Sequence, residues 1–210
     1  MTENDMTKIK QTILEYVEEK IRNGEIETPA DSKLDSFLGI RFGEDGDKYA
    51  DVDTAGEEDK GDGTIVVEGV KARQFLEFRN VAINLSPSDK KVVSIIAFAD
   101  NVGDDRKESY LADVLRLLQK KYWIEPIRVT LDDIRQKLEE LKIDLSNVRD
   151  DLDEEVKLYV FPFYNADEGR VVASISFVYY EDEGFILLAR DEEAYRELYR
   201  QAEQSQLDAL

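Results

Sequence analysis

The sequence predicts an α+β fold, in which an N-terminal helical pair, antiparallel strands and a C-terminal three-stranded meander pack with helices. Stretches with apolar residues at helical spacing alternate with short stretches rich in Val, Ile and Phe, in the order ααβββαβαβββα. Turn-forming residues join the strands, which favours antiparallel pairing. The 210 residues are enough for one well-filled core or for two small domains that share an interface.

Residues 1–42 are expected to form an N-terminal helical segment. Apolar residues recur on one helical stripe, and Gly24 supplies a C′ residue that ends this helix. Thr28 as N-cap and Pro29 at the first helical position then predict a second short helix that packs on the first. The inward residues are Ile9, Ile13, Leu14, Val17 and Ile21 in the first helix and Leu34, Phe37 and Leu38 in the second.

The segment 43–63 carries nine carboxylates, two lysines and five glycines. This composition predicts a mobile, solvated, self-repelling loop that the fold does not require. A calcium loop is the alternative, because the spacing of the acidic residues and of Gly56 partly fits one. Ala55 in the fifth position of that loop, where Asp or Asn is usual, argues against it. The candidate metal ligands would be Asp51, Asp53, Asp59 and Asp62.

Residues 64–149 are expected to form the first part of the α+β core. Three strands are predicted in "GTIVVEG", "RQFLEFRNVAINL" and "KKVVSIIAFAD". The apolar phase of the second changes near Arg79 and Asn80, which indicates a bulge or a break. A helix in "DDRKESYLADVLRLLQKKYW", a short strand in "IEPIRVT" and a helix capped by Thr130 follow. Trp123, at the end of the first of these helices, is either packed in the core or an interface anchor.

Residues 150–210 are expected to form a meander plus a helix, and residues 64–210 are either two parts or one continuous domain. The strand "VKLYVFPFY" is apolar on both faces, so each face needs a cover. The simpler expectation is that helices cover both faces. The alternative is that one aromatic face is exposed and binds a partner. The same pattern predicts that Phe161, Phe177 and Phe185 are buried and that Tyr159 or Phe163 is covered by a helix or a second chain.

Composition excludes several classes of site. The chain has no Cys, which excludes disulfides and thiolate chemistry, and no His, which excludes Ser–His triads and the usual zinc sites. No cofactor is expected. Because the sequence shows neither a membrane-length apolar run nor a signal-peptide core, we expect an intracellular, cytoplasmic protein, in a host cell or a virion if it is viral.

The formal net charge of −20 disfavours direct binding to nucleic acids and to acidic membranes. The charge is uneven: residues 43–63 carry −7 and residues 154–210 carry −8, whereas residues 64–99 carry +2. A salt-rich habitat should spread acid over every exposed surface, so this unevenness weakens that explanation. The acidic surplus instead favours a surface that meets a basic partner.

Catalysis has one candidate constellation. Glu155 and Lys157 in "DEEVK" resemble the acidic-x-Lys element of metal-dependent nucleases, in which a carboxylate holds the metal and the Lys contacts the phosphate. Such a site also needs an Asp on a neighbouring strand and a positive surface, and the sequence indicates neither. No catalytic residue is therefore assigned.

The sequence thus predicts a non-enzymatic acidic protein that docks on a basic partner surface, in the manner of a phage-type inhibitor that imitates a nucleic acid. One alternative is a structural subunit of a virion-like assembly that contacts neighbouring subunits or further copies of itself. The less favoured alternative is a metal-dependent phosphodiester-cleaving enzyme. The candidate partner-binding residues are Asp150, Asp151, Asp153, Glu154, Glu181, Asp182, Glu183, Glu192 and Glu193.

Overall fold

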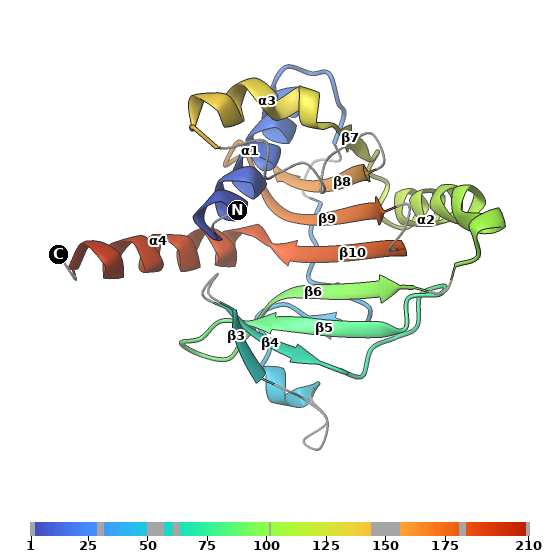
Figure 1. The fold of residues 1–210 in the computed structure, drawn as a ribbon, viewed down its shortest axis with the longest axis horizontal. Coiled ribbons are helices and arrows are strands. Elements are labelled where there is room, and N and C mark those ends of the chain that lie inside the picture. The colour runs from blue at the N-terminus through green and yellow to red at the C-terminus, as the bar shows by residue number, and fades with distance from the viewer. Residues whose placement is uncertain are drawn as a thin grey trace.

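The computed structural model of the protein describes residues 3–28, 32–49, 57–60, 64–100, 102–143, 156–180 and 184–208. Within these residues, four α-helices accompany a large antiparallel sheet and a separate two-stranded hairpin. This arrangement confirms the predicted α+β class (Figure 1).

The large sheet has eight strands, and every neighbouring pair is antiparallel. The spatial order is β3-β4-β5-β6-β10-β9-β8-β7, so the two runs of strands meet where β6 pairs with β10. That pairing extends from Ala99 opposite Phe185 to Ser94 opposite Arg190. The strands are β3 (Glu57–Lys60), β4 (Thr64–Glu68), β5 (Asn80–Leu85), β6 (Val92–Ala99), β7 (Ile127–Val129), β8 (Val156–Asn165), β9 (Arg170–Tyr180) and β10 (Gly184–Asp191).

Local chemistry explains the ends of the helices. The first helix, α1 (Glu3–Arg22), ends in a Schellman motif, in which Gly24 at φ 71° donates to Ile21 and the next amide donates to Lys20. Thr130 and Asp133 form a reciprocal capping box at the start of α3 (Leu131–Glu140). Asp191 caps α4 (Glu192–Asp208) by accepting hydrogen bonds from two amides of its first turn. The remaining helix is α2 (Lys107–Tyr122).

The predicted second helix near residue 30 is wrong for the described part of that segment. Residues 36–41 form a hairpin of β1 (Ser36–Phe37) and β2 (Ile40–Arg41). Its two turn residues, Leu38 and Gly39, have φ values of 51° and 83°, which a helix cannot accommodate. The three apolar residues assigned to the inside of that helix are nevertheless buried.

The acidic segment 43–63 is not a free loop throughout. The amides of Gly43 and Gly46 donate to the carbonyls of Val92 and Lys90, at 2.9 and 3.0 Å. Gly46 opens a short 3-10 helix and is buried against Leu85, and residues 57–60 form the edge strand β3. The prediction of a loop is therefore wrong for residues 46–48 and 57–60, whereas four of the seven residues in 43–49 are exposed to solvent as expected. Residues 50–56 and 61–63 lie outside the described residues.

The predicted break near Arg79 and Asn80 is confirmed. Strand β5 begins at Asn80, and the residues before it form a tight turn in which Phe75 bridges to Phe78 and Leu76 has a φ of 49°. The register shift within the strand falls later, between Asn84 and Leu85. The change of apolar phase thus marks the end of a turn and not a bulge.

Each face of the sheet carries its own hydrophobic core. The first core lies on the face with Phe161, Phe177 and Phe185, and α2 and the β1–β2 hairpin pack against it. The second core lies on the face with Leu158 and Val160, under α1 and α3. Phe163 is buried in the first core and makes an edge contact with Tyr122 of α2, at 5.3 Å between ring centroids. The predicted two-sided burial of β8 is confirmed.

The second core covers only part of its face. Figure 1 shows α1 and α3 gathered over the β7–β9 end of the sheet, whereas α4 meets β5 and β6 through Tyr195 in its first turn. On β6 and β10 this face carries half-buried apolar side chains, among them Ile96, Phe98, Ile186 and Leu188. The part of this sheet face that α1 and α3 cover ends along α1 and β10.

We predict that Gly184→Ala destabilises the protein by about 3 kcal/mol, whereas Gly169→Ala costs about 1 kcal/mol. Both glycines have positive φ, at 106° and 67°. At Gly184 an added Cβ would also lie 2.7 Å from the carbonyl oxygen of Ala99 on β6, whereas at Gly169 nothing lies nearer than 3.8 Å. Urea unfolding of the two variants measures the difference. Equal losses would contradict the close approach of β10 to β6 at this end of the sheet.

Candidate functional site

Of the nine predicted acidic residues, the structure describes Glu192 and Glu193, together with residues that flank the others. Val156 pairs with Tyr180, and Tyr180 pairs with Gly184, so the described residues that flank 150–155 and 181–183 lie side by side. Glu193 follows the opposite end of β10, roughly 23 Å away along the eight residues of that strand. Asp150, Asp151, Asp153, Glu154, Glu181, Asp182 and Glu183 themselves lie outside the described residues.

Glu192 does not belong to an exposed acidic surface, contrary to its assignment from the sequence. It is only 2% exposed, and its Oε1 accepts a hydrogen bond from the Ser174 hydroxyl at 2.5 Å. The physical reason is that β10 continues to Asp191, so the first residue of α4 still lies against the sheet. Glu193 is exposed as expected and pairs with Arg170 at 2.8 Å.

The structure gives the metal hypotheses no described ligand set. Asp51, Asp53, Asp62 and Glu155 lie outside the described residues, and Asp59 lies on β3, where only the backbone is described. The Lys157 ammonium lies over the ring of Tyr179, at 5.6 Å from its centroid. Within the part of the chain that the structure describes, no three His, Cys, Asp or Glu side chains come close enough to share a metal ion.

A groove lies between α1 and the sheet. Its apolar part, with a volume of about 160 Å³, has side chains of β8, β9 and β10 as its floor and α1 as its wall. The small side chain of Ser176 lies on β9 between Val160 and Leu188 on the neighbouring strands, which hollows the floor. The apolar lining residues are Ile9, Ile13, Leu14, Leu158, Val160, Val178 and Leu188, with Tyr180 at the end of β9.

The other end of the groove is polar. It widens between α1 and α4 into a space of about 360 Å³, and it shares Lys10, Leu14, Arg190 and Glu192 with the apolar part. The two spaces therefore adjoin at Arg190 and Glu192. The remaining lining residues of the polar end are Gln11, Glu15, Glu18, Tyr195, Arg196, Tyr199 and Arg200.

Buried polar side chains surround the point where the apolar and the polar part of the groove meet. The Arg190 guanidinium is 3.9 Å from Glu192 and lies over the Tyr195 ring, 4.5 Å from its centroid. The Tyr195 hydroxyl accepts a hydrogen bond from the Asn84 amide at 3.1 Å and lies 3.2 Å from the Ser94 hydroxyl. Because β5, β6, β9, β10 and α4 all contribute to it, this cluster fixes the start of α4 against the middle of the sheet.

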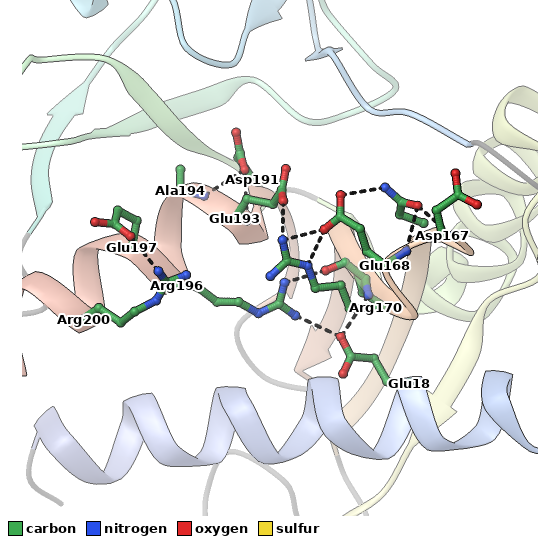
Figure 2. A network of polar contacts seen from close by, with 12 residues as sticks. Glu18, Asp167, Glu168, Arg170, Asp191, Glu193, Ala194, Arg196, Glu197 and Arg200 are labelled. Carbon is green, nitrogen blue, oxygen red and sulfur yellow. Dashed lines mark hydrogen bonds and ion pairs between the residues drawn. The ribbon is translucent and has the colours of Figure 1, made fainter.

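A second network includes Glu18 and Arg196, which line the polar end of the groove (Figure 2). Arg196 of α4 donates to Glu18 of α1 at 2.9 Å and to the Val171 carbonyl at 2.8 Å. Glu18 also accepts a hydrogen bond from the Val171 amide at 2.9 Å. Arg170 pairs with Glu168 and Glu193, at 2.5 and 2.8 Å. These contacts connect α1 with β9 and α4, which lie almost 150 residues or more further along the chain.

Two residues outside the groove have perturbed pKa values. Burial raises the pKa of Tyr110 to about 12, and Tyr110 packs against Phe185 in the first core. Burial would raise the pKa of Asp133, but hydrogen bonds from Thr130 and Tyr16 outweigh it and hold that pKa below its usual value. Both residues have structural roles, and neither marks an acid–base catalyst.

Sequence reasoning missed the groove and the Arg190–Glu192 pair. In "FILLARDEE" the pair resembles the charged end of a strand followed by a helix start. The detectable sign was a set of polar residues inside strands that are otherwise apolar: Asn84, Ser94, Ser174 and Ser176. Three of them, Asn84, Ser94 and Ser174, are buried, and because a buried polar residue needs a partner, their position on one face indicates a polar cluster.

Comparison of the chain with known protein families, with curated proteins and with solved structures gives no significant match. Among the described helices, none is both long enough and apolar enough to cross a membrane.

We predict that Ser174→Ala destabilises the protein by about 2 kcal/mol, because it removes the hydroxyl that donates to the buried Glu192 carboxylate. Ser176→Ala is the matched control, since Ser176 lies two residues along β9 on the same face and is half-exposed. It is expected to change stability by less than about 0.5 kcal/mol. Urea unfolding at neutral pH provides the comparison. A loss of stability in the control as large as in Ser174→Ala would contradict this role.

Proposed function

We propose that this is a non-catalytic interaction protein whose acidic surface docks on a basic partner protein. One observation carries the proposal: of the acidic side chains that the structure describes, only Glu192 is buried. The other described carboxylates are therefore at least partly exposed, in a chain whose formal net charge is −20. A surface of one sign attracts partners of the opposite sign and accelerates their association.

The described ion pairs do not remove this surplus, because each pair uses one charge of either sign. Most of them join residues three to five positions apart or on adjacent elements, as in Lys107–Asp104 and Arg116–Asp113. Such pairs fix local geometry. They leave the net charge of the protein unchanged, and so also the electrostatic field at a distance from it. Exposed carboxylates without an ion pair among the described residues remain on several elements, including Glu68, Asp105, Glu108, Glu125 and Asp167.

The acidic segments 150–154 and 181–183 are the proposed centre of the contact. The described residues that flank them are adjacent at one end of β8, β9 and β10. The specific form of the proposal is that these carboxylates imitate the phosphates of a nucleic acid and inhibit a protein that binds one. The supporting feature is the density of acid, since seven of these eight residues are Asp or Glu.

Trp123 favours a second candidate function, that of a subunit in a larger assembly. Its side chain is 81% exposed, although Trp is rarely left in solvent without a role. Its backbone has a φ of 57°, where Gly would be favoured, so neither packing nor backbone preference explains a Trp there. Exposed Trp is a frequent anchor of protein interfaces, including those between copies of one chain.

The test is affinity capture from the native host at low salt, followed by binding kinetics with the captured, purified partner. One variant carries Asp150→Asn, Asp151→Asn, Asp153→Asn, Glu154→Gln, Glu181→Gln, Asp182→Asn and Glu183→Gln. We predict that it associates about tenfold more slowly, with a smaller change in dissociation, and that the unmodified protein loses affinity steeply with salt.

The matched control removes seven exposed charges elsewhere, by amide substitution of Glu68, Asp105, Glu108, Glu125, Glu139, Glu140 and Asp167. It should retain most of the association rate. An equal loss in both variants would show that only net charge matters, and a partner held independently of salt would contradict electrostatic docking. Cleavage of a phosphodiester that requires a divalent metal and is abolished by Lys157→Ala alone would replace the proposal with an enzyme.

A further inference from the structure

Trp123 and the apolar part of the groove are complementary in chemistry and in size. Trp123 follows the last residue of α2, and its side chain is 81% exposed. The apolar part of the groove has a volume of about 160 Å³, similar to that of an apolar protein cavity that binds benzene. Its lining residues Ile13, Leu14 and Leu188 are half-buried, so the groove opens to the surface. An indole ring can therefore enter it with its benzene ring first.

Trp123 and the groove lie on opposite faces of the sheet. Helix α2 packs on the face that carries the first core, whereas α1 packs on the face that carries the second core and forms the wall of the groove. Because the sheet lies between them, Trp123 cannot enter the groove of its own chain, but it can enter that of a second copy. Such a contact joins two unlike surfaces, so it can repeat from copy to copy into a ring or a filament.

The charge around Trp123 favours a second copy of the chain as its partner. Residues 119–128 carry three exposed cations and one exposed carboxylate, namely Lys120, Lys121, Arg128 and Glu125. The chain as a whole has a net charge of −20, so the negative surface of another copy attracts this locally positive end. The net charges of the two copies repel each other at the same time. Because salt screens both effects, the association should depend only weakly on salt.

The area available around the groove suits a small interface. Half-buried Ile96, Phe98 and Ile186 lie beside Leu188 on the same face, so a second copy in the groove would also cover them. A buried Trp contributes roughly 150–250 Å², whereas stable interfaces bury about 1,200–2,000 Å² in total. Trp123 is thus the anchor of a weak contact, to which the neighbouring apolar side chains add.

From these observations we propose that Trp123 of one copy inserts into the groove between α1 and the sheet of the next copy, so that the chain associates head-to-tail with itself. The inference rests on the second candidate function, a subunit of a larger assembly, and names the contact that builds it. Trp123 and the groove are separate from the acidic segments proposed to meet a basic partner. Trp123→Gly should therefore leave the capture of that partner unchanged, and either proposal can fail without the other.

Sedimentation and tryptophan fluorescence of the intact protein test the contact. Trp123 is the only Trp of the chain, so the emission reports on its surroundings alone. We expect the emission to shift to shorter wavelength over the same concentration range in which the sedimenting mass increases. The Kd should lie between about 10 µM and 1 mM, as usual for a small interface. It should change less than about threefold between low and physiological salt.

Two variants each remove one half of the contact. Trp123→Gly removes the inserted side chain at a φ of 57°, which Gly adopts readily, so the fold is retained. Ser176→Leu fills the hollow in the floor of the groove. Each variant alone should associate at least tenfold more weakly than the unmodified protein. An equimolar mixture should form dimers and nothing larger, because Trp123 of the Ser176→Leu chain can still enter the intact groove of the Trp123→Gly chain.

Leu141→Ala is the matched control, since Leu141 is another exposed apolar residue that follows a helix and does not line the groove. It should associate like the unmodified protein. If Ser176→Leu does not fold, indole added to the unmodified protein tests the groove instead. It should shift the amide signals of α1, β9 and β10 and dissociate the oligomer. A monomer with unchanged emission at about 1 mM, full association of Trp123→Gly, a monomeric mixture of two folded variants, or no effect of indole would each overturn the proposal.

Discussion

The pairing of β6 with β10 is the interaction on which the rest of the structure depends. It joins strands that are almost ninety residues apart and merges two runs of strands into one sheet of eight. The first core depends on this continuity, because Phe78 before β5 packs edge-on to Phe177 of β9, and Tyr110 of α2 packs on Phe185 of β10. On the other face, the same pairing places Ser94 beside Arg190 and so brings together the polar cluster at the end of the groove.

Much of the fold could be predicted because its causes are local. Helical stripes, Gly24, the capping residue Thr130 and the alternating strands each act within a few residues, and the structure has helices and strands where they indicate. The β6–β10 pairing has no local cause, since any apolar strand of suitable length could pair with β10. The sequence predicts a helix where residues 36–41 form a hairpin, because Thr28 and Pro29 resemble a helix start, whereas no residue type indicates the positive φ at Leu38.

The candidate site could also be predicted only in part from the sequence. Composition was enough to predict an acidic surface, because a charge of −20 must be exposed in a folded chain. Composition could not show that Glu192 is buried while Glu193, the next residue, is exposed. That difference depends on how far β10 extends before α4 begins, which is a tertiary property. The α1–β10 groove likewise combines an apolar floor with cations and carboxylates at one end, an arrangement that composition does not reveal.

Native-state hydrogen exchange, measured amide by amide, tests the single-sheet arrangement most directly. If β6 and β10 hold one sheet together, the slowest-exchanging amides of both strands open with the same free energy, equal to that of global unfolding. Denaturant should then lower both values in parallel. If β4–β6 instead open at a distinctly lower free energy than β8–β10, the two runs of strands fold as separate units, and the groove end and the first core do not depend on their pairing.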